Sequence, residues 1–142
     1  MPAIAETKLA ALREALARRP EILEAYVFGS FARGEAQPHS DVDVAVYLAS
    51  VPARGLGADA EIAADLMRAL GSDRVDVVVL NQAPPLLYHR VLRDGIRLVA
   101  RDLAATSVRE GRALSRYCDY VPQLAKIRAA RAERRARGEF GR

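Results

Sequence analysis

Two aspartates, Asp41 and Asp43, lie two positions apart and open a hydrophobic stretch with the pattern of a strand. Successive side chains of a strand point to opposite faces, so positions i and i+2 share one face. Both carboxylates are therefore expected to project together from the start of the strand. Because neighbouring carboxylates repel, one should bind a proton unless a cation lies between them. Mg²⁺ meets this need, since it favours one or two carboxylates together with substrate phosphates.

A small polar corner precedes the carboxylates, and ten residues separate Gly29 and Ser30 from Asp41. Glycine lets the backbone approach a ligand closely. A serine hydroxyl and the free N–H groups of a following helical turn can hold a phosphate oxygen. Arg33, one short turn farther on, either reaches the same phosphate or is an exposed helix residue. A phosphate anchor beside a metal-binding carboxylate pair indicates phosphoryl or nucleotidyl transfer.

A third carboxylate, Asp76, interrupts the otherwise apolar stretch 75–80. An unpaired carboxylate would be costly in such a strand. Asp76 is therefore either a functional residue near the first two aspartates or an edge-facing residue paired with Arg74 or another cation. Two other kinds of site find no support, because the chain has no GKS or GKT sequence for a P-loop and no Cys/His cluster for zinc.

Apolar periodicity and the positions of Pro and Gly predict the elements that position these residues, and helices alternate with strands among them. This alternation predicts an α/β domain. The predicted helices cover residues 4–18, 59–70, 84–93 and 103 to about 137, and the predicted strands cover 22–28, 41–48, 75–80 and 96–100.

Three details of these elements can be tested against a structure. Asp59 is a suitable N-cap for the second long helix. The continuous apolar run at 75–80 predicts a central strand that is covered on both faces. The last helix contains Pro122, where an interruption is possible, and Cys118, which is predicted to be a buried small apolar residue.

Composition predicts one soluble globular domain, since the chain has 142 residues, of which 51% are hydrophobic and 28% charged. No apolar run approaches the roughly 20 residues of a membrane helix, and the N-terminus lacks the features of a signal peptide. A cytoplasmic location is therefore expected. The net charge of +4 is uneven, because residues 126–142 carry seven Lys/Arg and two Glu. We therefore predict a domain at 1–125 and a basic tail at 126–142, and direct nucleic-acid binding by the body is not expected.

The signature formed by Gly29-Ser30, ten residues and Asp41-Val42-Asp43 resembles the Gly-Ser-x10-Asp-x-Asp signature of DNA polymerase β-like nucleotidyltransferases. The small size resembles the minimal nucleotidyltransferase (MNT) branch, which includes the antitoxins of HEPN/MNT toxin–antitoxin pairs. This resemblance implies a polymerase palm with a mixed sheet of about four strands, helices packed on one side and a long C-terminal helical segment.

The resemblance also implies a role for each candidate residue. Asp41 and Asp43 would bind one or two Mg²⁺ ions that bridge to the triphosphate of ATP. Gly29 and Ser30 would hold the β- and γ-phosphates. Asp76 would be a third carboxylate that helps to bind the metal and to activate the attacking hydroxyl.

The activity that the resemblance implies is transfer of AMP from ATP to a tyrosine hydroxyl near the RNase site of a HEPN-domain toxin, which neutralises the toxin. Residues 116–122 are similar, more weakly, to a stretch near the C-terminus of these antitoxins. There the helix helps to contact the toxin. The tyrosines of 116–122, Tyr117 and Tyr120, could equally pack on the sheet. Two other functions remain open: a non-catalytic binding antitoxin, and a small-molecule nucleotidyltransferase similar to the aminoglycoside-modifying enzymes.

Overall fold

The computed structural model describes residues 2–34, 41–51 and 57–138 of the chain. Its helices and strands alternate as the sequence predicts, with bounds within a few residues of those expected. In chain order they are α1 (Pro2–Ala17), β1 (Ile22–Phe28), α2 (Gly29–Ala32), β2 (Val42–Leu48), α3 (Ala58–Leu70), β3 (Val75–Val79), the 3-10 turn η1 (Leu80–Gln82), α4 (Pro85–Asp94), β4 (Ile96–Ala100) and α5 (Leu103–Ala136).

The four strands form one mixed sheet in the order β3-β2-β1-β4, which confirms the predicted fold class. Strand β1 pairs antiparallel with both β2 and β4, and β2 pairs parallel with β3. The prediction that residues 75–80 form a central strand is wrong, because β3 lies at an edge. Its continuous apolar run has another cause: Val77 and Val79 pack on the core of one sheet face, and Val78 packs on the core of the other.

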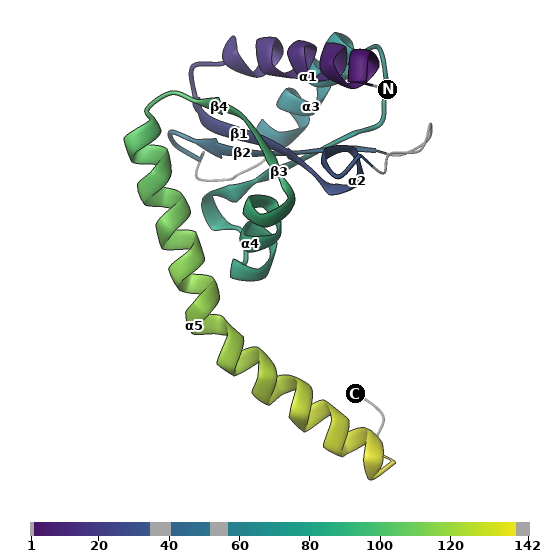
Figure 1. Ribbon diagram of the computed structural model, residues 1–142, viewed down its shortest axis with the longest axis vertical. Helices are drawn as coiled ribbons and strands as arrows, with labels where there is room; N and C mark the ends of the chain where they lie inside the picture. Colours follow the sequence, from purple (N-terminus) through teal and green to yellow (C-terminus); the bar gives the residue numbers. More distant parts are fainter. Residues whose placement is uncertain (1, 35–40, 52–56, 139–142) are drawn as a thin grey trace.

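Helices cover both faces of the sheet, which corrects the expectation that they pack on one side. Figure 1 shows α1 and α3 on one face, with α4 and the start of α5 on the other. Strand β2 separates the two cores, because Val44 and Val46 face the first layer whereas Ala45 and Tyr47 face the second. The first core includes Leu12, Leu16, Ile62 and Leu66, and the second includes Tyr26, Tyr88, Val91 and Ala113.

Helix α3 begins one position earlier than expected, with Gly57 at its N-cap. Asp59 lies inside the first turn, where its side chain accepts a hydrogen bond from the Ala60 N–H at 2.9 Å. The prediction that Asp59 caps the helix is therefore wrong, although its negative charge still suits the first turn of a helix.

Helix α5 is attached to the sheet through its first half. Glu24 on β1 is fully buried and accepts two hydrogen bonds from the Arg109 guanidinium, both at 2.7 Å, and one from the Thr106 hydroxyl at 2.9 Å. The helix stays against α4 as far as Tyr117, whose ring stacks on that of His89 with centroids 3.6 Å apart. Its last part extends away from the rest of the molecule (Figure 1). Cys118 in this part is exposed, so the prediction that it is buried is wrong.

Helix α5 continues through Pro122, where an interruption was possible, and crosses position 125 into the basic segment. The division into a domain at 1–125 and a tail at 126–142 stays a prediction, and residues 139–142 lie outside the described part. In the described ranges, no helix is long and apolar enough to cross a membrane.

Candidate active site

The corner after β1 lies against the second aspartate of β2. Antiparallel pairing places Phe28, the last residue of β1, opposite Asp43. The next residue, Gly29, has a φ of +75°, which favours glycine. A β-carbon at this position would lie 2.3 Å from Oδ2 of Asp43. The carboxylate therefore occupies the space that any side chain at position 29 would need.

Helix α2 is a single turn that carries Ser30 and leads into Arg33. Ser30 is half-buried directly after Gly29. The Arg33 side chain is 43% exposed, and its guanidinium lies 3.7 Å from a carboxylate oxygen of Asp94 on α4. The positive charge of Arg33 also acts to lower the pKa of Asp43. The arginine is therefore both an accessible residue and a neighbour of the predicted site.

Three carboxylates meet at one end of the sheet. Asp43 on β2 is in register with Asp76 on β3, and side chains in register on parallel strands point to the same face. Burial is the main cause that raises the pKa of Asp43, followed by the charges of Asp76 and Asp41. The structure thus brings together the aspartates that the sequence singled out, although they come from two strands.

The first aspartate, Asp41, immediately precedes β2 and is half exposed. One of its oxygens lies 4.0 Å from the Arg74 guanidinium, which is equally exposed. The backbone of this region is fixed as well, because the Val42 N–H donates to the Arg74 carbonyl at 2.9 Å. The segment before β3 is therefore attached to the start of the strand that carries the aspartate pair.

The carboxylate oxygens at this site suit a hard divalent cation that is coordinated partly by the protein and partly by a substrate. Asp41 and Asp43 offer carboxylate oxygens. The pKa of Asp43 is raised first by burial and then by the negative charges of Asp76 and Asp41, and a cation would offset both effects. No group of three or more His, Cys, Asp or Glu side chains in the described ranges is placed to hold a metal. This arrangement fits Mg²⁺, which is usually bound by one or two carboxylates plus phosphates and water.

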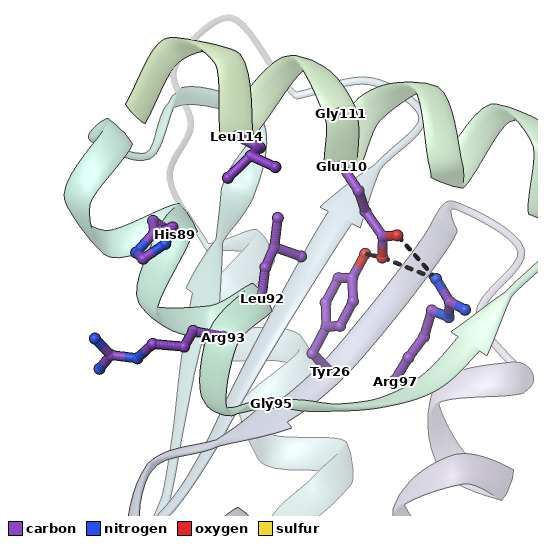
Figure 2. Close-up of a pocket in the computed structure, with 9 residues that line it drawn as sticks. All are labelled: Tyr26, His89, Leu92, Arg93, Gly95, Arg97, Glu110, Gly111 and Leu114. Atoms are coloured by element: carbon purple, nitrogen blue, oxygen red, sulfur yellow. Dashed lines mark hydrogen bonds and ion pairs between the residues drawn. The ribbon is translucent and has the colours of Figure 1, made fainter. Parts of the chain in front are cut away.

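A separate cavity of about 590 Å³ lies among β1, β4, α4 and α5, and Figure 2 shows the residues that line it. The Tyr26 hydroxyl donates to Glu110 at 2.7 Å, and Arg97 donates to the same carboxylate at 2.9 and 3.0 Å. Burial and the bond to Glu110 raise the pKa of Tyr26. These three polar groups bond to one another, and the rest of the cavity wall includes Leu92 and Leu114 beside His89 and Arg93.

Sequence reasoning missed Asp94 as the carboxylate beside Arg33, and Glu24 as the buried partner of Arg109. Asp94 is the last residue of α4, directly before Gly95, and this helix end is its only local signal. Glu24 occurs within an apolar stretch, as Asp76 does, and a charged residue in such a strand indicates a partner. Neither partner could be identified from spacing along the chain.

Comparison with known protein families gives one match, over residues 10–104, to the family described as Polymerase beta, Nucleotidyltransferase. The matched segment contains all four strands and the Gly29, Asp41, Asp43 and Asp76 positions. No curated protein matches the chain.

Solved structures of similar shape include toxin–antitoxin complexes. The crystal structure of a toxin-antitoxin with AMP-PNP is 28% identical, with a TM-score of 0.68 over 89% of this chain and 97% of that one. A toxin-antitoxin MntA-HpeT mutant, in which two aspartates two positions apart are changed to glutamate, is 25% identical, with a TM-score of 0.67 over 89% and 97%. The tri-AMPylated Shewanella oneidensis HEPN toxin in complex with MNT antitoxin is 24% identical, with a TM-score of 0.67 over 89% and 98%, and shows likeness of fold.

Proposed function

The chain belongs to the polymerase β-type nucleotidyltransferase family, and from this premise we propose that it is an antitoxin that transfers AMP from ATP to a tyrosine hydroxyl of a HEPN-domain RNase toxin. The observation that carries the proposal is the likeness, over nearly all of both chains, to a toxin-antitoxin crystallised with AMP-PNP. The aspartates exchanged in the MntA variant have the same spacing as Asp41 and Asp43, which supports their proposed role.

Each proposed residue has a task that follows from its position. The open backbone at Gly29, with the Ser30 hydroxyl, would receive the β- and γ-phosphates, and the Arg33 charge would attract them. Asp41 and Asp43 would hold Mg²⁺. When bound, this ion would neutralise phosphate charge and orient the triphosphate. Asp76, which is exposed, would complete the acidic group.

The proposed transfer requires one bond to form and one to break. The tyrosine oxygen of the toxin attacks the α-phosphorus of ATP, and the bond between this phosphorus and its bridging oxygen breaks, so that pyrophosphate leaves. The proton of the tyrosine hydroxyl passes to a nearby base, for which Asp76 is the candidate. The reaction uses intracellular ATP, which suits the proposed cytoplasmic location.

The proposal predicts that label from ATP marked at the α-phosphate will appear on the HEPN-domain product of the adjacent gene. Mg²⁺ should be required, and EDTA should abolish the transfer, because Asp41 and Asp43 cannot orient the triphosphate without a cation. Electrophoresis and peptide mass spectrometry would locate the label. Label that appears on neither protein, or that appears equally in EDTA, would contradict the proposal.

A second candidate function, neutralisation by binding alone, is favoured by the distal half of α5. This half exposes apolar side chains on a helix that extends away from the sheet, including Val121 and Ile127. An ATP analogue with a methylene group between the α- and β-phosphates separates the two functions, because it cannot donate AMP. If the toxin is neutralised equally with this analogue and with ATP, the protein neutralises it by binding alone and AMP transfer is not required.

The Gly29→Ala substitution is expected to lower the AMP-transfer rate by roughly 10²-fold, because the new β-carbon would displace the Asp43 carboxylate and misplaced catalytic groups lose about this much. Gly34→Ala is a matched control, since Gly34 has the same φ of +75° but a β-carbon there meets no atom of the described residues within 4 Å. Both variants should lose about 1 kcal/mol of stability from backbone strain. Equal transfer rates in the two variants would show that contact with Asp43 is unimportant.

A further inference from the structure

A cavity of about 450 Å³ lies where the end of β2, helix α4 and helix α5 meet. This volume is within the range of small-molecule binding sites. Strand β2 contributes Tyr47, and α4 contributes Tyr88. Helix α5 contributes Arg109, Arg112, Ser115 and Arg116. Tyr47 lies on the same face of β2 as Asp43 but four residues farther on, which is roughly 13 Å along a strand. The cavity is therefore separate from the nucleotide site.

The lining of this cavity carries positive charge without a carboxylate among its described residues. Arg109 is compensated by the buried Glu24, and its guanidinium also lies 4.9 Å from the centre of the Tyr47 ring. Arg112 and Arg116 are both exposed and form no ion pair with the described part of the chain. The Arg116 guanidinium lies 5.8 Å from the centre of the Tyr88 ring. Two guanidinium groups, one helical turn apart, are thus available to an anion.

The Tyr88 hydroxyl is a second, independent feature of the same cavity. The residue is 1% exposed, and within the described ranges its hydroxyl has no hydrogen-bond partner. Burial raises the pKa of Tyr88 to about 12, although Arg109 and Arg116 act in the opposite direction, so the group remains a proton donor at neutral pH. Buried polar groups nearly always have a partner, and this donor lacks an acceptor.

The Asn81 side chain, another polar group of the wall, already has hydrogen-bond partners in the protein. The Asn81 side chain accepts from the Leu48 N–H at 2.9 Å and donates to the Leu48 carbonyl at 2.8 Å. The groups left to a ligand are therefore the guanidinium forks of Arg112 and Arg116, the phenolic O–H groups of Tyr47 and Tyr88, and the Ser115 hydroxyl. This set matches a ligand with several acceptor oxygens and a negative charge, as a phosphoryl group has.

We propose that this cavity binds the phosphoryl group of a small phosphorylated molecule, held by Arg112, Arg116 and the Tyr88 hydroxyl, at a site distinct from the one that takes ATP. The inference rests on the cavity itself and does not depend on the proposed AMP transfer. Bound ligand would lie against the first half of α5, where that helix is attached to the sheet through Glu24.

The test is a nuclear magnetic resonance titration of the full-length protein in EDTA, which suppresses metal-dependent binding at Asp41 and Asp43. AMP, inorganic phosphate and uncharged adenosine are the probes. AMP and phosphate are expected to shift the backbone amides of Tyr88, Arg112 and Ser115, whereas adenosine leaves them unchanged. Tighter binding of AMP than of phosphate would identify an organic phosphate as the ligand, and equal binding would identify the free ion.

Arg112→Ala with Arg116→Ala should weaken AMP binding at least roughly tenfold, because two charge-assisted contacts are lost. Arg128→Ala with Arg131→Ala is the matched control, since it removes the same charge from α5 outside the cavity. Tyr88→Phe should weaken binding several-fold without lowering the melting temperature, because the hydroxyl has no hydrogen-bond partner among the described residues. Unshifted amides, or equal losses in the two double variants, would overturn the proposal.

Discussion

Replacing Asp41 and Asp43 together by asparagine is expected to lower the rate of AMP transfer to the toxin by roughly 10³-fold, as loss of a preorganised electrostatic group does. Asparagine keeps the shape of each side chain but removes the charge that would hold Mg²⁺ beside Gly29. Single-turnover kinetics with labelled ATP measures the rate, and co-purification with the toxin measures binding. Full toxin neutralisation by the double variant would contradict the catalytic function.

The single variant Asp43→Asn separates loss of activity from loss of folding. The pKa of Asp43 is raised, first by burial and then by the charges of Asp76 and Asp41, so the folded protein binds this proton more tightly than the unfolded chain does. The resulting contribution to stability is lost as the pH rises through the raised pKa. At pH 7 without metal, the Asp43→Asn substitution should therefore raise the melting temperature while it lowers activity. A lower melting temperature would show that ionised Asp43 stabilises the fold.

Replacing Glu24 by alanine is expected to lower the free energy of unfolding by about 3–5 kcal/mol, the typical cost of breaking a buried ion pair. Glu24 is fully buried, and its removal leaves Arg109, which is only 20% exposed, and the Thr106 hydroxyl without their carboxylate. Urea unfolding measures the difference. The large loss is expected because β1 is the strand through which α5 is attached to the sheet.

Glu14→Ala is the control for this substitution. Glu14 also pairs with an arginine, Arg18, but both side chains are about 70% exposed. Exposed ion pairs contribute about 0–1 kcal/mol, so the control should change stability little. A further variant, Glu24→Met with Arg109→Met, should recover much of the stability, since an apolar pair can replace a buried ion pair. Similar effects of Glu24→Ala and Glu14→Ala would contradict the importance of the buried contact.

Local patterns were sufficient to predict the helices, the strands and the two faces of β2. They also indicated a phosphate anchor beside the carboxylate pair, and the antiparallel pairing of β1 with β2 is what places Gly29 against Asp43. The position of β3 at an edge was not predictable. An apolar run indicates that both faces of a strand are covered, but it does not indicate how many strands pair with it.

Features that depend on distant residues could not be predicted. The Arg33 contact to Asp94 joins α2 to α4, and the Glu24 contact to Arg109 joins β1 to α5 across 85 positions. Cys118 was predicted to be buried because helical periodicity does not reveal where a helix leaves the body of the molecule. The Tyr88 cavity arises where three elements meet, and no spacing along one segment indicates it.

Because β3 is an edge strand, the cluster of Asp41, Asp43 and Asp76 is expected to open more readily than the middle of the sheet. Among the described strands β3 is hydrogen-bonded to β2 alone, so fraying there breaks fewer bonds than opening the middle of the sheet. Such fraying moves Asp76 away from Asp43 while β1 and β2 keep the Gly29 corner intact. Opening of this edge would therefore remove Asp76, transiently and reversibly, from the proposed metal site while Asp41 and Asp43 keep their positions.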